Sequence, residues 1–263
     1  MQGYDFIVKS TTSHQIPQRI KEEFTLQNIL ELLSYNDPNK YYTNSKVISI
    51  TQKIFILCFE GTEKIDYNFY NTCLEFAISF YKFKKISLEI SGKLKKIIQK
   101  IPFTKNQFSI YLDFTTLQHS DFQYSTATIY RILSFLSKNR HDNIYFLGIG
   151  RGCIPSLIDI VNFLINNRSL EIDFDIIPFS HRKSKEEEID FMPEIISKIK
   201  QQENSLILVY HEDISSGRTA AISHNTIKTL INENNFLYTT ANNISFLAKS
   251  KIKNEIGEDS IIR

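Results

Sequence analysis

Apolar and polar positions follow a regular pattern from Phe108 to the end of the chain. Two segments have the i, i+3, i+4, i+7 apolar spacing of an amphipathic helix: Ile129, Ile132, Leu133 and Leu136 in one, and Leu157, Ile160, Val161 and Leu164 in the other. Apolar or alternating runs predict strands at 108–112, 144–147, 171–176 and 206–210, further helices at 191–200 and from Thr219, and strand-like pieces near Phe236 and at 244–248. Strands and helices that alternate at these lengths predict an α/β fold with a mostly parallel sheet and helices on both faces.

The first part of the chain has a less regular pattern. It predicts a helix at 16–35 that ends at the turn signal Asn36-Asp37-Pro38, strands at 47–50 and 54–59, and a helical region at 67–100 interrupted near Ser91-Gly92. No motif in this part indicates a chemistry. We therefore divide the chain into an N-terminal α+β region, 1–105, and a second domain, 106–263.

Composition places the 263-residue chain among ordinary globular proteins, with 42% hydrophobic and 23% charged residues. A net charge of +2 is not typical of a dedicated nucleic-acid binder. The three cysteines form no CxxC pair, which favours reduced thiols and a cytoplasmic location. No apolar stretch is long enough to span a bilayer, and the first ten residues do not have the pattern of a signal peptide, so no membrane association is expected.

Glycine is concentrated at two predicted strand-to-helix turns. The chain has only eight glycines, yet Gly148, Gly150 and Gly152 fall within five residues after one predicted strand, and Gly217 follows a later one. Glycine at such a turn allows the backbone to come close to a neighbour or a ligand. Amide groups at a helix N-terminus bind phosphate well, so both turns are candidate anion sites.

The later turn, residues 206–219, resembles the phosphoribosyl-pyrophosphate (PRPP) motif of type I phosphoribosyltransferases. In that family an apolar strand runs into two acidic residues and then a Thr-Gly-x-Thr-like loop that holds the 5′-phosphate. The resemblance implies that the phosphate loop here is Ser215, Ser216, Gly217, Arg218 and Thr219. A gapless alignment puts the acidic pair on His211 and Glu212, whereas a one-residue deletion puts it on Glu212 and Asp213. The second alignment keeps both carboxylates for the ribose hydroxyls; the first loses one of them to histidine.

The earlier turn is similar to the pyrophosphate loop of the same family. The resemblance implies that Gly150 and Gly152 bring the backbone to the diphosphate and that Arg151 lies beside it. It also implies that Lys183, with Arg182, meets the leaving pyrophosphate from the charged loop 180–188. Magnesium is the implied cofactor, held by Glu212 and Asp213. The resemblance covers roughly residues 108–248.

The implied function is a cytoplasmic phosphoribosyltransferase of nucleotide metabolism, a pentosyltransferase that uses PRPP and a nitrogenous acceptor and releases pyrophosphate. The alternative is a module that binds PRPP or a nucleotide without turnover and acts as a regulator or as a subunit of a larger assembly. A homodimer or a partner protein stays open. Nucleic-acid contact through the lysines of 82–105 is a weaker alternative. A dinucleotide site at the first turn is disfavoured because Cys153 occupies a position where that pattern has glycine or alanine.

Overall fold

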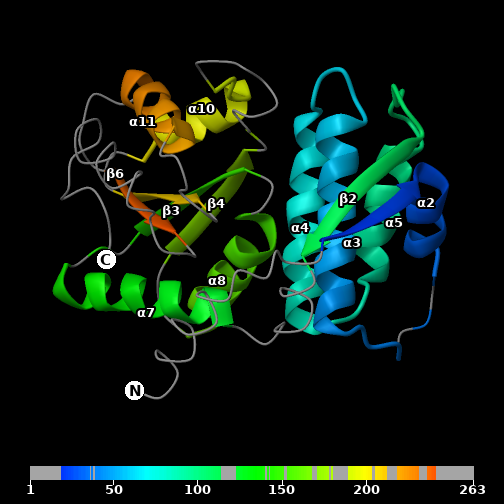
Figure 1. Ribbon diagram of the computed structural model, residues 1–263, viewed down its shortest axis with the longest axis horizontal. Helices are drawn as coiled ribbons and strands as arrows, with labels where there is room; N and C mark the ends of the chain where they lie inside the picture. Colours follow the sequence, from blue (N-terminus) through cyan, green and yellow to red (C-terminus); the bar gives the residue numbers. More distant parts are fainter. Residues whose placement is uncertain are drawn as a thin grey trace.

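The structure is a computed structural model of the 263-residue chain. It describes residues 19–35, 37, 39–113, 123–139, 141, 143–150, 153–167, 171–177, 179, 189–202, 205–211, 218–230 and 236–240. These residues form two regions that lie side by side, one made mostly of helices and the other built around a parallel sheet (Figure 1).

The first region is a group of helices covered by a two-stranded ribbon. Its elements are β1 (Arg19–Thr25), α2 (Leu26–Leu33), α3 (Asn44–Glu60), α4 (Tyr67–Phe83), α5 (Leu88–Ile98) and β2 (Gln107–Asp113). The strands β1 and β2 are antiparallel and pair along their whole length, from Arg19 opposite Asp113 to Thr25 opposite Gln107. Figure 1 shows this ribbon lying across the helices, with α2 on the outer side.

Three predictions for this region were wrong. The segment expected to be one helix at 16–35 contains the strand β1 before the shorter helix α2, and the two strands expected at 47–50 and 54–59 are the single helix α3. The break expected near Ser91-Gly92 lies instead between α4 and α5, where Lys84 ends α4 with a left-handed φ of 53°. In α3 the β-branched and aromatic residues favour a strand locally, but Val47, Ile54 and Leu57 are all fully buried against the neighbouring helices. Burial on several sides of a helix outweighs the intrinsic strand preference.

The second region is a parallel sheet between two layers of helices, as predicted. Its elements are α7 (Gln123–Lys138), β3 (Asn143–Ile149), α8 (Cys153–Asn167), β4 (Glu171–Ile177), α10 (Pro193–Lys200), β5 (Leu206–His211), α11 (Arg218–Leu230) and β6 (Phe236–Thr240). The strand order is β4-β3-β5-β6, and all three pairings are parallel. In Figure 1, α7 and α8 lie on one side of the sheet and α10 and α11 on the other. The strand expected at 244–248 lies outside the described residues.

One strand belongs to a different sheet than we expected. The apolar run at 108–112 forms β2, but β2 pairs with β1 of the first region and not with the parallel sheet. The predicted boundary at 105/106 therefore falls just before a strand that is hydrogen-bonded to the N-terminal region.

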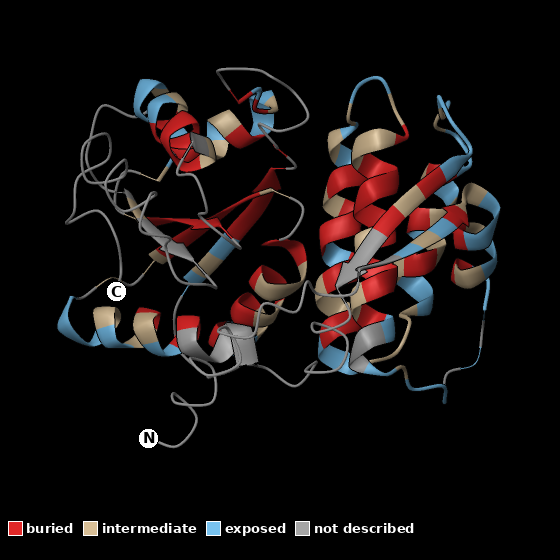
Figure 2. Ribbon diagram, viewed as in Figure 1, coloured by how far each residue is buried: buried red, intermediate tan, exposed pale blue. Residues whose placement is uncertain are grey.

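The two regions share a continuous apolar interior. Figure 2 shows buried residues on the facing sides of the helices and throughout β3 and β5, whereas exposed residues line the outer faces. The helix α4 packs against α8, and α3 also touches α8, so the first region covers the β4 side of the sheet. In the part of the chain that the structure describes, no helix has the length and apolar character needed to cross a bilayer.

Candidate functional site

The sheet has a topological switch point between β3 and β5. From β3 the chain passes through α8 to β4 on one side, and from β5 it passes through α11 to β6 on the other. The two strands are direct neighbours, and their last residues, Ile149 and His211, are in register. Because the connections diverge there, the carboxyl ends of β3 and β5 border the crevice in which open parallel sheets bind ligands. In the sequence, the two glycine-containing turns follow these two strands.

At the end of β3, two glycines have separate structural roles. A Cβ on Gly148 would lie 2.6 Å from Leu157 Cδ2 and 2.9 Å from Cys153 Sγ, so Gly148 allows α8 to pack closely on the sheet. Gly150 has a φ of 98°, a left-handed conformation that favours glycine. Its N–H donates to Ile177 O at 2.7 Å, and the Cys153 thiol donates to Gly150 O at 2.8 Å. The Gly150 amide is thus hydrogen-bonded within the fold.

At the end of β5, the histidine is part of the protein interior. His211 is 3% exposed, and its Nε2 lies 3.4 Å from Ser223 Oγ on α11. Burial lowers the pKa of His211 to about 4, so the ring is neutral at physiological pH. The preceding residue, Tyr210, is fully buried, and its hydroxyl donates to Ser156 Oγ at 2.8 Å on the opposite face of the sheet.

Most of the predicted site residues lie outside the described residues. These are Arg151, Gly152, Lys183, Glu212, Asp213, Ser215, Ser216 and Gly217. Arg218 is the first residue of α11, and Thr219 follows it, half-buried. Within the described residues no group of three or more histidine, cysteine, aspartate or glutamate side chains is arranged to hold a metal ion.

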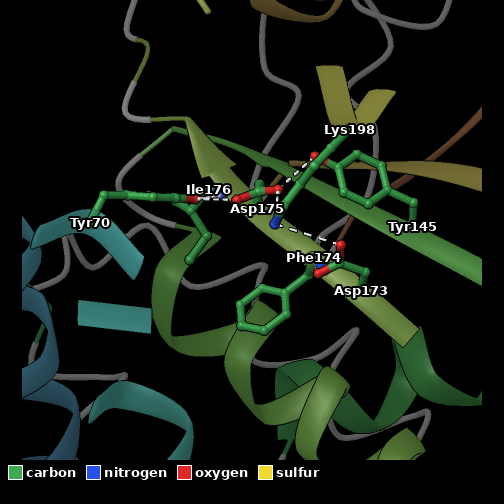
Figure 3. Close-up of polar contacts among 7 residues, drawn as sticks. All are labelled: Tyr70, Tyr145, Asp173, Phe174, Asp175, Ile176 and Lys198. Atoms are coloured by element: carbon green, nitrogen blue, oxygen red, sulfur yellow. Dashed lines mark hydrogen bonds and ion pairs between the residues drawn. The ribbon is translucent and has the colours of Figure 1, made fainter. Parts of the chain in front are cut away.

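A buried polar cluster that the sequence did not predict joins the two regions (Figure 3). Its centre is Asp175 of β4, which is fully buried. The Tyr70 hydroxyl donates to Asp175 Oδ1 at 3.0 Å, and the Tyr145 hydroxyl donates to Oδ2 at 2.7 Å. Lys198 of α10 donates to Oδ2 at 3.1 Å and lies 3.6 Å from Asp173 Oδ2. Three donors from three elements therefore converge on one carboxylate.

Tyr70 also caps the open edge of the sheet. The strand β4 is an edge strand, and Ile176 N–H donates to the Tyr70 hydroxyl at 2.7 Å. A residue of the first region thus satisfies a backbone donor that the sheet itself leaves unpaired. Burial, together with the nearby Asp175 carboxylate, raises the pKa of Tyr70 well above its ordinary value. The alternating sequence of β4 predicted that one face of the strand is buried, but it does not indicate that Asp175, on the polar face, is buried as well.

Burial raises the pKa of Asp175, although Lys198 and the two phenols oppose this shift. The pKa of Lys198 is also raised: desolvation lowers it, but the attraction of Asp175 and Asp173 outweighs that effect. The cluster is closed off from solvent at Asp175 and lies within the packed interior, so we assign it a structural role and not a ligand-binding one.

A scan of protein-family models and a search of curated proteins found no match to this chain.

The close contact of α8 with the sheet gives a first prediction. Gly148→Ala is expected to lower stability by about 1–3 kcal/mol, because the new methyl group requires buried Leu157 and Cys153 to move. Gly92→Ala is the matched control: a Cβ at this position in α5 meets nothing within 4 Å, so a gain of roughly 0.5–1 kcal/mol is expected from helix propensity. Urea denaturation of both variants measures the difference, and equal effects would contradict the close packing.

Proposed function

We propose that the chain binds a 5-phosphoribosyl compound, with PRPP as the first candidate, in the crevice between the ends of β3 and β5. The observation that carries this proposal is the juxtaposition of the carboxyl ends of β3 and β5, which the two glycine-containing turns follow in the sequence. These strands are adjacent, parallel and central, and they end at residues in register, so that one sugar phosphate can lie across both ends. On opposite edges of the sheet they could not share a ligand.

The end of β5 supports one alignment of the motif over the other. The strand continues through His211, which is buried against α11. A buried neutral histidine does not serve as a ribose-binding carboxylate, so the acidic pair is better assigned to Glu212 and Asp213, directly after the strand. This assignment keeps both carboxylates and favours an enzyme over a binding module.

The activity we propose is transfer of the phosphoribosyl group to a nitrogen nucleophile with release of pyrophosphate. By the resemblance, residues 215–219 hold the 5′-phosphate at the start of α11, where the helix dipole favours an anion. Glu212 and Asp213 orient the ribose hydroxyls and hold Mg²⁺, which neutralises charge on the diphosphate. Arg151 and Lys183 stabilise the leaving group.

A thermal-shift titration tests ligand binding. PRPP with Mg²⁺ is expected to raise the Tm, since a ligand at a hundred times its Kd stabilises the folded state by about 2.7 kcal/mol. Gly217→Trp, which would fill the phosphate loop, is expected to abolish the shift, whereas Gly92→Trp on the distant helix α5 should keep it. Absence of any shift with millimolar PRPP and Mg²⁺ would contradict the proposal.

Release of pyrophosphate separates the enzyme from the binding module. A panel of purine, pyrimidine and small amine acceptors is incubated with PRPP and Mg²⁺, and pyrophosphate is measured. Turnover with any acceptor identifies a transferase. A thermal shift without turnover across the panel would favour the regulatory module.

A further inference from the structure

Exposed aromatic rings, with lysines beside them, gather at one end of the N-terminal helices, among the described residues of 35–42 and in 82–88. We define the aromatic–lysine patch as Tyr35, Lys40, Tyr41, Lys82, Phe83, Lys84, Lys85 and Leu88. The two segments are joined by a backbone hydrogen bond from Tyr42 N–H to Lys84 O of 2.9 Å. This bond fixes the loop before α3 against the end of α4, so residues more than forty positions apart form one surface.

The rings of this patch face solvent. Tyr41 is 70% exposed, Phe83 57% and Tyr35 45%, although large apolar side chains are more often covered. All three rings come from only two short segments, so they form a concentration of exposed aromatic surface. Such a concentration marks an interaction site more often than single exposed rings do.

The lysines of the patch lie beside these rings. Lys85 Nζ is 4.1 Å from the centre of the Tyr41 ring, Lys40 Nζ is 4.4 Å from that of Tyr35, and Lys82 Nζ is 5.4 Å from that of Phe83. The two segments contain four lysines and one acidic residue, Asp37. The patch is therefore locally basic in a chain whose net charge is only +2.

We infer that the aromatic–lysine patch binds single-stranded nucleic acid. Exposed bases stack on aromatic side chains, and amines beside the rings meet the phosphates between the bases. Each lysine covers one face of its ring at most, and the large exposed fraction of Tyr41 leaves surface for a base. A membrane-binding helix instead presents a continuous apolar face along its length. Here the rings come from a loop and a helix end and are interleaved with lysines, which favours a nucleic acid.

The full-length protein and a fluorescein-labelled oligouridylate test this inference by fluorescence anisotropy. Tyr41→Ala and Phe83→Ala are each expected to weaken binding about tenfold through the loss of a stacking ring. Tyr130→Ala is the matched control, because Tyr130 of α7 is 69% exposed but lies outside the patch. It should bind as the wild type does.

Salt dependence tests the role of the lysines. If each of the four lysines contacts one phosphate, the affinity should fall about 50-fold between roughly 50 and 200 mM NaCl. Lys85→Gln removes one of these contacts, so it should reduce the slope of log K against log salt concentration by about 0.7. The inference is overturned if the oligouridylate does not bind, or if Tyr130→Ala loses as much affinity as Tyr41→Ala. It is also overturned if the protein binds phosphatidylserine vesicles and the oligouridylate fails to compete.

Discussion

Asp175→Ala is expected to lower the free energy of unfolding by about 3–5 kcal/mol, because it removes one partner from a buried charged cluster. The Asp175 carboxylate accepts hydrogen bonds from Tyr70, Tyr145 and Lys198, all at 3.1 Å or less. Without it, two fully buried phenol hydroxyls lose their acceptor, and Lys198, whose side chain is 27% exposed, keeps only Asp173. Urea denaturation at neutral pH, followed by circular dichroism, measures the loss.

Asp173→Ala is the matched control for this experiment. Asp173 lies two residues earlier on β4 and also contacts Lys198, but its side chain is 53% exposed and the distance is 3.6 Å. Exposed ion pairs contribute at most about 1 kcal/mol, so this variant should be close to the wild type. If the two variants lose the same stability, the Asp175 cluster does not hold the two regions together.

The parallel sheet could be predicted because each of its elements has a clear local pattern. Apolar residues four and seven positions apart identify α7 and α8, and the uninterrupted apolar runs of β3 and β5 are typical of strands buried on both faces. The placement of both glycine-containing turns at the ends of these strands followed from the same patterns. Their adjacency did not, because the sequence does not indicate strand order. The structure provides it through the pairing of β3 with β5.

The N-terminal region was harder to predict, because its local and tertiary preferences disagree. The segment of α3 is rich in isoleucine and phenylalanine, which favour strands in isolation, and only the surrounding helices make a buried helix more stable. The strand β1 needs β2, which follows it by more than eighty residues. Tyr70 and Asp175 are 105 residues apart, so nothing local indicates their contact.

Contacts of the helix α4 link the two regions. The edge strand β4 has a buried aspartate and an unpaired backbone donor, and Tyr70 satisfies both. The helix α4 that carries Tyr70 also packs on α8, which in turn packs on Gly148 at the end of β3. The N-terminal region therefore supports β4 directly and β3 through α8.

Acid destabilisation through His211 is the second large effect that we expect. The folded protein keeps His211 neutral down to a pKa of about 4, whereas the unfolded chain protonates it near its ordinary value of 6.5. The unfolded state therefore binds more protons between these two values, and stability falls as the pH falls through that window. The difference between the two pKa values corresponds to a loss of about 3 kcal/mol in the free energy of unfolding by the time the pH has fallen to 4.

Unfolding free energies of the wild type and His211→Gln, measured from pH 7 to about pH 4, test this effect. The variant is expected to lose this part of the pH dependence whatever its stability at neutral pH, so the slope and not the absolute value is the readout. Ser223→Ala should keep the wild-type slope, because burial and not the serine hydroxyl lowers the pKa of His211. Burial raises the pKa of Asp175 above its ordinary value of 3.8, so Asp175 affects the pH dependence of stability in the opposite direction to His211. The stability that Asp175 contributes at low pH is lost as the pH rises above 3.8. Both proteins contain Asp175, so its contribution cancels when the unfolding free energy of His211→Gln is subtracted from that of the wild type at each pH. If the unfolding free energy of the variant has the same slope against pH as that of the wild type, the prediction for His211 is wrong.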